Sequence, residues 1–198
     1  MPQMSNRIQL FTDSVIRRMT RISDACQAIN LSQGFPDFPP PKALTDTLKQ
    51  IADNGPHQYS VTYGADNVRE AIAQKASPTL KRSISAADEV LVTCGSTEAM
   101  MCAMMTVCNP GDKVAIFSPF YENYMADTIL CGAEPIFIPL VPPAYQFDSG
   151  LLEQAFQQGA KALILCNPSN PCGKVFTLQE LEQIAALAIQ YDAVVITD

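Results

Sequence analysis

Short apolar runs rich in valine, isoleucine and leucine recur through the second half of the chain, and helical patterns separate most of them. They lie at residues 89–93, 113–117, 135–138, 162–166 and 193–197. Strands that are apolar along their whole length are typical of parallel sheets whose two faces are both covered by helices. The sequence therefore predicts an α/β fold with a mostly parallel sheet sandwiched by helices.

Helical periodicity explains much of the remaining chain. Apolar residues recur at spacings of three and four, which places them on one buried face of a helix. The spacing of Thr177 and Glu180 is that of a capping box, in which each residue caps the other's free amide. Helices are expected at residues 13–26, 41–54, 67–76, 99–107 and 177–191.

The domain organisation is predicted from composition. Prolines are concentrated in residues 30–41, where they prevent regular structure and stiffen a loop. The change in sequence character falls near residues 60–85, where a proline-rich, mixed part gives way to an alternating α/β part.

The composition limits the classes of function. Hydrophobic residues make up 47% of the 198 residues and charged residues 17%, which indicates a folded protein. A net charge of −7 without a lysine or arginine run argues against partners such as nucleic acid or a membrane surface. The first 30 residues lack the apolar stretch of a signal peptide, so a cytoplasmic location is expected.

The cysteines and the lone histidine do not suggest a metal site. Seven cysteines occur without a Cys-x-x-Cys pair or a neighbouring histidine, so no metal is expected and buried, reduced thiols are the favoured interpretation. His57 lies in a polar turn-like stretch, which favours a surface position over a catalytic one.

Gly95, Ser96 and Thr97 lie where an apolar strand runs into an apolar helix. Free backbone amides at a helix start, together with two hydroxyls, suit a phosphate dianion. An ordinary helix cap uses the same residue types without any ligand, and on this motif alone the ordinary cap is the favoured interpretation.

The segment from Asn170 to Gly173 follows the apolar run at residues 162–166, so it is placed at the carboxyl end of a strand, where α/β sheets bind ligands. Prolines on both sides of the loop hold the amide of Asn170 stiffly, while Gly173 permits a backbone angle that other residues resist. A plain Asn-Pro turn is the alternative. Lys174, directly after the loop, is expected to be exposed.

Two more side chains are predicted to lie at this edge. Tyr121 follows the run at residues 113–117, where its ring could stack on a flat heteroaromatic molecule, although core or rim packing is the commoner role of such a ring. Asp198 ends the run at residues 193–197. A carboxylate there is suited to pair with a pyridinium nitrogen, although taken alone it is a polar strand end.

Together these motifs resemble the fold-type I, class I/II aminotransferases, which depend on pyridoxal 5′-phosphate. The similarity runs from about residue 10 to the end and is greatest to the kynurenine/glutamine and the bacterial methionine aminotransferases. It also includes residues 30–38, the Gln58-Tyr59 pair and Gly64. The resemblance implies the large domain of an aspartate-aminotransferase-like fold. It implies that residues 1–40 form an N-terminal arm with a substrate loop, as part of a small domain, and that residues 41–198 form the large α/β domain, incomplete at its C-terminus.

The resemblance also implies roles for single residues. Gly95, Ser96 and Thr97 would bind the cofactor phosphate, Tyr121 would stack on its ring, Asn170 would bind its phenolic oxygen and Asp198 its ring nitrogen. Tyr59 would reach the phosphate in a neighbouring subunit, which implies a homodimer. The substrate would be bound by Gly34, Ile16 and Asn170.

Relatives continue beyond the position of Asp198, first with a Glu-x-Tyr and some tens of residues later with a Ser-x-x-Lys that carries the Schiff-base lysine. No lysine of this chain matches that position, so no catalytic residue is assigned and the chain alone is expected to be inactive. Cys172 departs from the threonine or leucine that is usual in the Asn-Pro motif, which leaves the polarity of the loop open.

The expected activity of the intact protein is the transfer of an amino group from an L-amino acid to a 2-oxo acid. Two alternatives stay open at this point. Similar sites catalyse β-elimination of sulfur amino acids, as C–S lyases, or cyclopropane-carboxylate synthesis, and a non-catalytic aminotransferase-like sensor domain would need no lysine at all. The residues of this chain do not distinguish between them.

Overall fold

The computed structural model describes residues 3–11, 13–34 and 36–198. Met1, Pro2, Thr12 and Phe35, which fall within the expected arm and substrate loop, lie outside the described residues. The chain forms two compact units, Asp13–Cys94 and a second unit made of Met1–Thr12 with Gly95–Asp198. The assignment of residues 41–198 to a single large domain stays a prediction.

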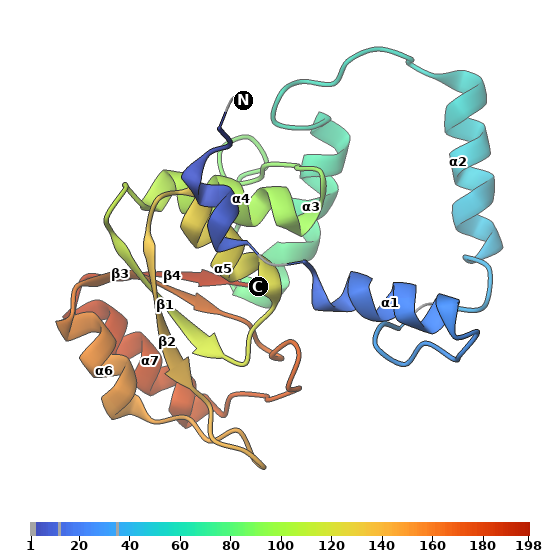
Figure 1. Cartoon of the computed structure of the whole chain (residues 1–198). Helices are drawn as coiled ribbons and strands as arrows, with labels where there is room; N and C mark the ends of the chain where they lie inside the picture. Colours follow the sequence, from blue (N-terminus) through green and yellow to red (C-terminus); the bar gives the residue numbers. More distant parts are fainter. Residues whose placement is uncertain (1–2, 12, 35) are drawn as a thin grey trace. The chain divides into compact units, whose positions relative to one another are not determined.

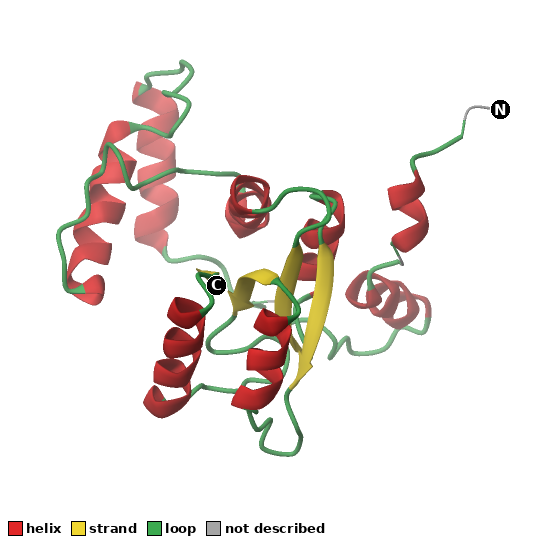
Figure 2. Ribbon diagram, turned by 90° about the vertical axis from the view of Figure 1, so that its left-hand side faces the viewer, coloured by secondary structure: helices red, strands yellow, loops and turns green. Residues whose placement is uncertain are grey.

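The larger unit contains a parallel sheet. Its strands are β1 (Lys113–Ser118), β2 (Glu134–Pro139), β3 (Ala160–Leu165) and β4 (Val194–Thr197). They lie in the order β2-β1-β3-β4, and every neighbouring pair is parallel. Figure 2 shows the strands in yellow. Four of the five predicted strands are therefore confirmed, to within two residues at each end.

Helices cover both faces of this sheet, as Figure 1 shows. They are α4 (Gly95–Val107), α5 (Glu122–Leu130), α6 (Ser149–Gln157) and α7 (Leu178–Gln190). Alternate residues of β1 point to opposite faces, so Val114 and Ile116 pack with α4 and α5 while Ala115 and Phe117 pack with α6 and α7. The predicted sandwich is confirmed. The short η1 (Asn6–Leu10) packs on α5.

The predicted strand at residues 89–93 is wrong. This segment is not a strand: the Glu89 N–H donates to the Ser85 carbonyl at 2.9 Å, and the Val92 N–H donates to the Tyr63 carbonyl at 3.0 Å. A strand is defined by a ladder of bonds to a neighbour, and none of the strands in the described residues pairs with this segment. Leu91 remains half exposed. An apolar run is therefore not enough to form a strand, because a strand also needs a neighbouring strand to pair with.

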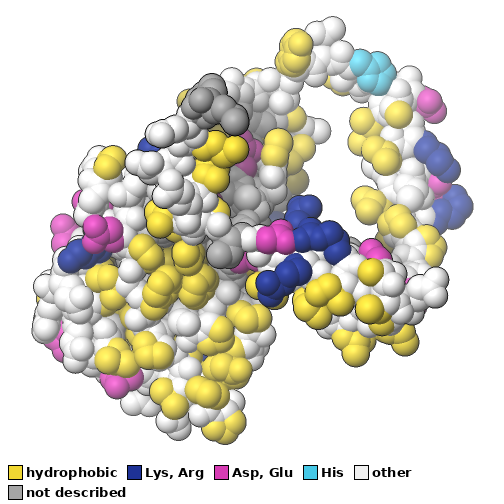
Figure 3. Space-filling view, viewed as in Figure 1, with side chains coloured by type: hydrophobic (Ala, Val, Ile, Leu, Met, Phe, Trp, Pro, Cys, Tyr) yellow, Lys and Arg dark blue, Asp and Glu magenta, His cyan; other side chains and the backbone are white. Residues whose placement is uncertain are grey.

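The smaller unit consists of α1 (Val15–Ala25), α2 (Lys42–Asn54), α3 (Asp66–Leu80) and their connections. α2 begins after Pro41 and ends at Asn54, capped by Gly55 with a φ of +64°, as predicted. α3 runs about one turn further than predicted, through Pro78 to a left-handed cap at Lys81. α1 and α2 leave many apolar side chains exposed, as Figure 3 shows.

Burial corrects one expectation and confirms another. All seven cysteines are free, but Cys26 and Cys94 are exposed and Cys108 alone is fully buried, so the expectation of buried thiols is wrong for most of them. His57 is exposed, as predicted. Of the helices within the described ranges, none has both the length and the apolar character needed to cross a bilayer.

Candidate cofactor site

The carboxyl ends of β1, β3 and β4 lie at one edge of the sheet, because these strands are parallel neighbours. Tyr121, Asn170 and Asp198 follow these three strands, so each reaches that edge from its own strand, as predicted. A small pocket at the edge is lined by Asn170 and by Phe117, Pro119, Phe120, Tyr124, Ile164, Cys166 and Ser169.

Asp198 is fixed at this edge by its backbone and its side chain. Its N–H donates to the Leu165 carbonyl at 3.0 Å, and its carbonyl accepts from the Asn167 N–H at 3.1 Å. The phenol of Tyr124 donates to Asp198 Oδ2 at 2.5 Å. The carboxylate therefore has one oxygen held by a neighbouring side chain while the residue stays exposed.

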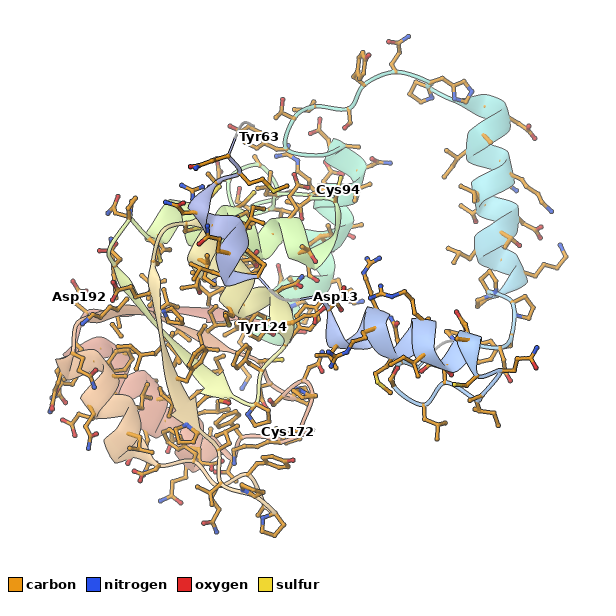
Figure 4. The ribbon with its side chains drawn as sticks, in the orientation of Figure 1. Asp13, Tyr63, Cys94, Tyr124, Cys172 and Asp192 are labelled. Atoms are coloured by element: carbon orange, nitrogen blue, oxygen red, sulfur yellow. The ribbon has the colours of Figure 1, made fainter. Side chains whose placement is uncertain are left out.

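Tyr124 is a site residue that the sequence reasoning missed. It lies on α5, is 3% exposed and is labelled in Figure 4. Burial raises the pKa of its phenol far above the ordinary value, and the hydrogen bonds to Asp198 and Cys166 raise it further. The phenol is consequently neutral at any physiological pH and acts as a donor. Its position three residues after Tyr121, the N-cap of α5, was the available signal.

The loop from Asn170 to Gly173 is closed by its own backbone. The Gly173 N–H donates to the Ser169 carbonyl at 2.7 Å, and the Ser169 N–H donates to the Lys174 carbonyl at 2.8 Å. Gly173 has a φ of +71°, which confirms the expected need for glycine. Asn170 is exposed at the tip of this loop, so its amide is presented at the sheet edge by a constrained backbone.

Lys174 does not point into solvent, and the expectation that it would is wrong. Its side chain is 7% exposed, and its ammonium group donates to Glu180 Oε1 at 2.8 Å. The ammonium also lies 4.8 Å from the centre of the Phe176 ring, within the range of a cation–π contact. Periodicity does not reveal this pair, because a basic residue beside a loop is normally solvated.

Ser96 and Thr97 lie in the first turn of α4, which begins at Gly95, four residues before the predicted start. Both are exposed, and Gly95 has a φ of +83°. Asn123 donates from Nδ2 to Thr97 Oγ1 at 3.0 Å and thereby orients the Thr97 hydroxyl. Two hydroxyls at a helix N-terminus are suited to an anionic group. Asn123 had no sequence signal of its own.

Tyr59, Ile16 and Gly34 belong to the smaller unit, so their roles in the site stay predictions. Tyr59 is fully exposed, whereas Ile16 is partly buried and Gly34 is exposed with no atom near the position of a Cβ. Full exposure leaves the Tyr59 hydroxyl accessible. No group of three potential metal ligands comes together in the part of the chain that the structure describes.

This combination of parallel sheet, helix-start hydroxyls and strand-end carboxylate is that of an α/β protein of the class I and II aminotransferase kind. The family model described as "Aminotransferase class I and II" matches residues 27–198. The chain therefore belongs to this family, whose members depend on pyridoxal 5′-phosphate. The expected family is confirmed.

Individual relatives agree with this assignment. The chain is 33% identical to the probable N-succinyldiaminopimelate aminotransferase DapC of Mycobacterium tuberculosis over 98% of its own length and 49% of the relative's. It is 34% identical to human kynurenine–oxoglutarate transaminase 1 over 90% of its length and 45% of the relative's.

Solved structures show the same fold. The YbdL methionine aminotransferase of Escherichia coli superposes with a TM-score of 0.92 at 30% identity, over 100% of this chain and 51% of that one. The aspartate aminotransferase of Thermus thermophilus superposes with a TM-score of 0.90 at 25% identity. The aspartate-aminotransferase-like fold is thus confirmed, and the chain spans about half the length of the relatives it matches.

Proposed function

We propose that this chain is the cofactor-binding portion of an enzyme that transfers an amino group from an L-amino acid to a 2-oxo acid, with pyridoxal 5′-phosphate as cofactor. The observation that carries the proposal is the carboxylate of Asp198, held by Tyr124 at the same sheet edge as Asn170. An anchored carboxylate among apolar and amide groups suits a flat cation such as a protonated pyridine ring. We place the protein in the cytoplasm.

The residues present fit this cofactor by their chemistry. The first turn of α4, with Gly95, Ser96 and Thr97, offers hydroxyls and helix-start amides to the phosphate. Asn170 supplies an amide for the phenolic oxygen, and Asp198 supplies the negative charge for the ring nitrogen. When bound, the cofactor withdraws electrons from the carbon that bears the amino group.

Tyr121 is assigned to the face of the cofactor ring. Its ring meets the Tyr124 ring edge to face, with 5.7 Å between their centres, so the orientation of Tyr121 is restricted by a buried neighbour. A restricted aromatic side chain loses little freedom when a flat ring stacks against it. Removal of this ring should therefore weaken cofactor binding more than it weakens folding.

The substrate and dimer contacts complete the proposal. Gly34 and Ile16, with Asn170, are assigned to the amino acid substrate, and Tyr59 to the cofactor phosphate of a partner subunit. The full exposure of Tyr59 supports an intermolecular role. No residue of this chain is assigned the covalent attachment of the cofactor or the transfer of the proton, for which relatives use a lysine outside the matched length.

The test uses the protein produced from its complete coding sequence and purified with pyridoxal 5′-phosphate. We expect one cofactor bound per chain and its conversion to the amine form on addition of a suitable L-amino acid, followed by its return with a 2-oxo acid. Release of ammonia and a thiol from cysteine-type substrates would instead support a C–S lyase. Cofactor binding without either reaction would support a sensor.

The 198-residue chain provides a second arm of the test. We expect it to retain no cofactor after borohydride treatment and to catalyse no transamination, because none of its residues is assigned to the covalent link. Stoichiometric trapping of cofactor on this chain would contradict the proposal.

A further inference from the structure

The hydrogen bond between the Tyr124 phenol and the Asp198 carboxylate is short, and no basic side chain pairs with the same carboxylate in the described residues. The donor and acceptor oxygens are 2.5 Å apart, which is the range of hydrogen bonds from a hydroxyl to an ionised carboxylate. Across the described ranges, no lysine or arginine forms an ion pair with Asp198. The phenol is thus the side-chain donor that stabilises this carboxylate.

Packing holds the phenol in place. Tyr124 is 3% exposed and belongs to the core cluster that includes Ile116 and Ile164, on the α4 and α5 side of the sheet. Its ring is also braced edge to face by Tyr121. A ring confined on these sides keeps its hydroxyl directed at Asp198 Oδ2. The neighbouring titratable group is the Cys166 thiol, which follows β3 and lines the same pocket.

We infer that Tyr124 is a positioning residue whose hydrogen bond to Asp198 Oδ2 keeps the proton shared with the cofactor's ring nitrogen on the nitrogen. The inference rests on the proposed function, because it concerns the same site. Tyr124, on α5, thereby joins the site residues that the sequence motifs indicated.

The physical reason is the response of a carboxylate to a donated hydrogen bond. A donor stabilises the ionised form relative to the protonated form, so the carboxylate becomes a weaker base. When a carboxylate and a pyridine nitrogen share one proton, the weaker base on the oxygen side leaves the proton on nitrogen. A carboxylate has two oxygens, so Tyr124 occupies Oδ2 and leaves Oδ1 for the ring.

The experiment measures the protonation of the ring nitrogen directly. The protein from the complete coding sequence is loaded with pyridoxal 5′-phosphate labelled with ¹⁵N in the ring, and the ¹⁵N chemical shift is followed against pH. We expect the wild-type nitrogen to be protonated across the neutral range. In Tyr124→Phe the midpoint should rise by about one pH unit, a tenfold change in the protonation equilibrium, because a carboxylate without the donated bond is a stronger base. Below the midpoint the ¹⁵N shift should move toward that of an unprotonated ring, because more of the shared proton lies on the carboxylate.

Tyr191→Phe is the matched control. Tyr191 donates its phenol to Glu153 Oε1 at 3.0 Å, in a pair between α6 and the end of α7 that has no part in the proposed site. The same substitution there removes a hydroxyl from a carboxylate and should leave the ¹⁵N midpoint unchanged. A shift of equal size in this control would assign the effect to general destabilisation and overturn the inference.

A second variant covers the case in which Tyr124→Phe fails to fold. A 3-fluorotyrosine at position 124 keeps the size of the ring and makes the phenol a stronger donor, so the midpoint should fall. An unchanged midpoint in the fluorinated protein overturns the inference while the proposed function stands. A wild-type protein that binds no cofactor refutes the proposed function and this inference with it, and the two failures are thereby distinguished.

Discussion

Lys174 and Glu180 form an ion pair that joins the loop of Asn170 to the first turn of α7. Their side chains are 7% and 18% exposed, and Nζ lies 2.8 Å from Oε1. The second oxygen of Glu180 accepts from the N–H of Thr177 at 2.8 Å, which completes the predicted capping box. One carboxylate therefore stabilises both the helix start and the loop that presents the site amide.

Replacement of Lys174 by methionine should destabilise the protein. The substitution leaves the Glu180 carboxylate partly buried without its cation, which should lower the free energy of unfolding by about 2 to 3 kcal/mol. The measurement is urea unfolding followed by circular dichroism. Lys161→Met is the control, because the ion pair of Lys161 with Asp112, at 3.1 Å, is much more exposed. This substitution should lower the free energy of unfolding by about 0.5 kcal/mol. Equal losses of unfolding free energy in the two variants would show that burial does not strengthen the Lys174–Glu180 pair.

The same pair predicts a response to acid. Burial raises the pKa of Glu180, but the hydrogen bonds from Lys174 and Thr177 outweigh it, so the folded-state pKa lies below the ordinary value. The stabilisation is fully present above the unfolded pKa of about 4.3 and is lost as pH falls through the folded pKa. Glu180→Gln should therefore flatten the dependence of the unfolding free energy on pH in this acid range. An unchanged slope would argue against the coupling.

Much of the sheet could be predicted from the sequence, because a strand buried on both faces must be apolar along its length. β1 and β3 meet this condition, and their predicted bounds agree with the structure to within two residues. The same rule failed at residues 89–93, since pairing depends on a neighbour that local composition does not encode. Helix ends with a capping box, such as Thr177, were predictable from spacing alone.

The site was predictable only where a motif follows a strand. Asn170 and Asp198 were placed at the sheet edge by chain order, and the parallel topology confirms that placement. Tyr124 and Asn123 could not be assigned roles in this way, because their partners lie 74 and 26 positions away in the sequence. Contacts of this kind depend on how α5 packs, which periodicity leaves undetermined.

Two substitutions test the helix-start hydroxyls as a phosphate site. Thr97→Val removes the hydroxyl and should weaken the affinity for pyridoxal 5′-phosphate about tenfold, the value of one hydrogen bond to a charged group. Asn123→Leu should weaken it less, because it only frees the Thr97 hydroxyl to rotate. Equilibrium dialysis with the protein from the complete coding sequence gives both affinities.

The control and the double variant sharpen this test. Thr106→Val removes a hydroxyl near the other end of α4, where Thr106 donates to the Cys102 carbonyl at 2.7 Å, and should leave affinity unchanged. In the double variant of Thr97 and Asn123, the two effects should not add, since the second substitution acts through the first. Full additivity would show that Asn123 acts independently of Thr97.

Cysteine reactivity should follow burial. Burial raises the pKa of the Cys108 thiol, with smaller contributions from Cys131 and Asp112, so little thiolate is available for alkylation. Cys26 is exposed. With iodoacetamide at pH 8, Cys26 should react at least about tenfold faster than Cys108, as measured by mass spectrometry of peptides. In urea the two rates should converge, and similar rates in the folded protein would contradict the burial of Cys108.

Asp127 on α5 has a buried carboxyl group, and not all of its hydrogen-bonding capacity is satisfied. It is 4% exposed, and its Oδ2 has no hydrogen-bond partner among the described residues. Burial raises the pKa of its carboxyl from 3.8 to about 6. The protonated form is thus favoured by folding, and ionisation of the folded protein above pH 6 places an unpaired charge in the interior.

Asp127→Asn should stabilise the protein at neutral pH and have little effect in acid. With a raised folded-state pKa, the contribution of Asp127 to stability is fully present below pH 3.8 and is lost as pH rises through about 6. The loss amounts to about 3 kcal/mol at pH 8. The unfolding free energies of Asp127→Asn and of the wild type, measured from pH 4 to pH 8, should agree near pH 4 and differ most at pH 8. The exposed Glu182→Gln on α7 is the control, and parallel curves for Asp127→Asn and wild type would show that Asp127 is not the group responsible.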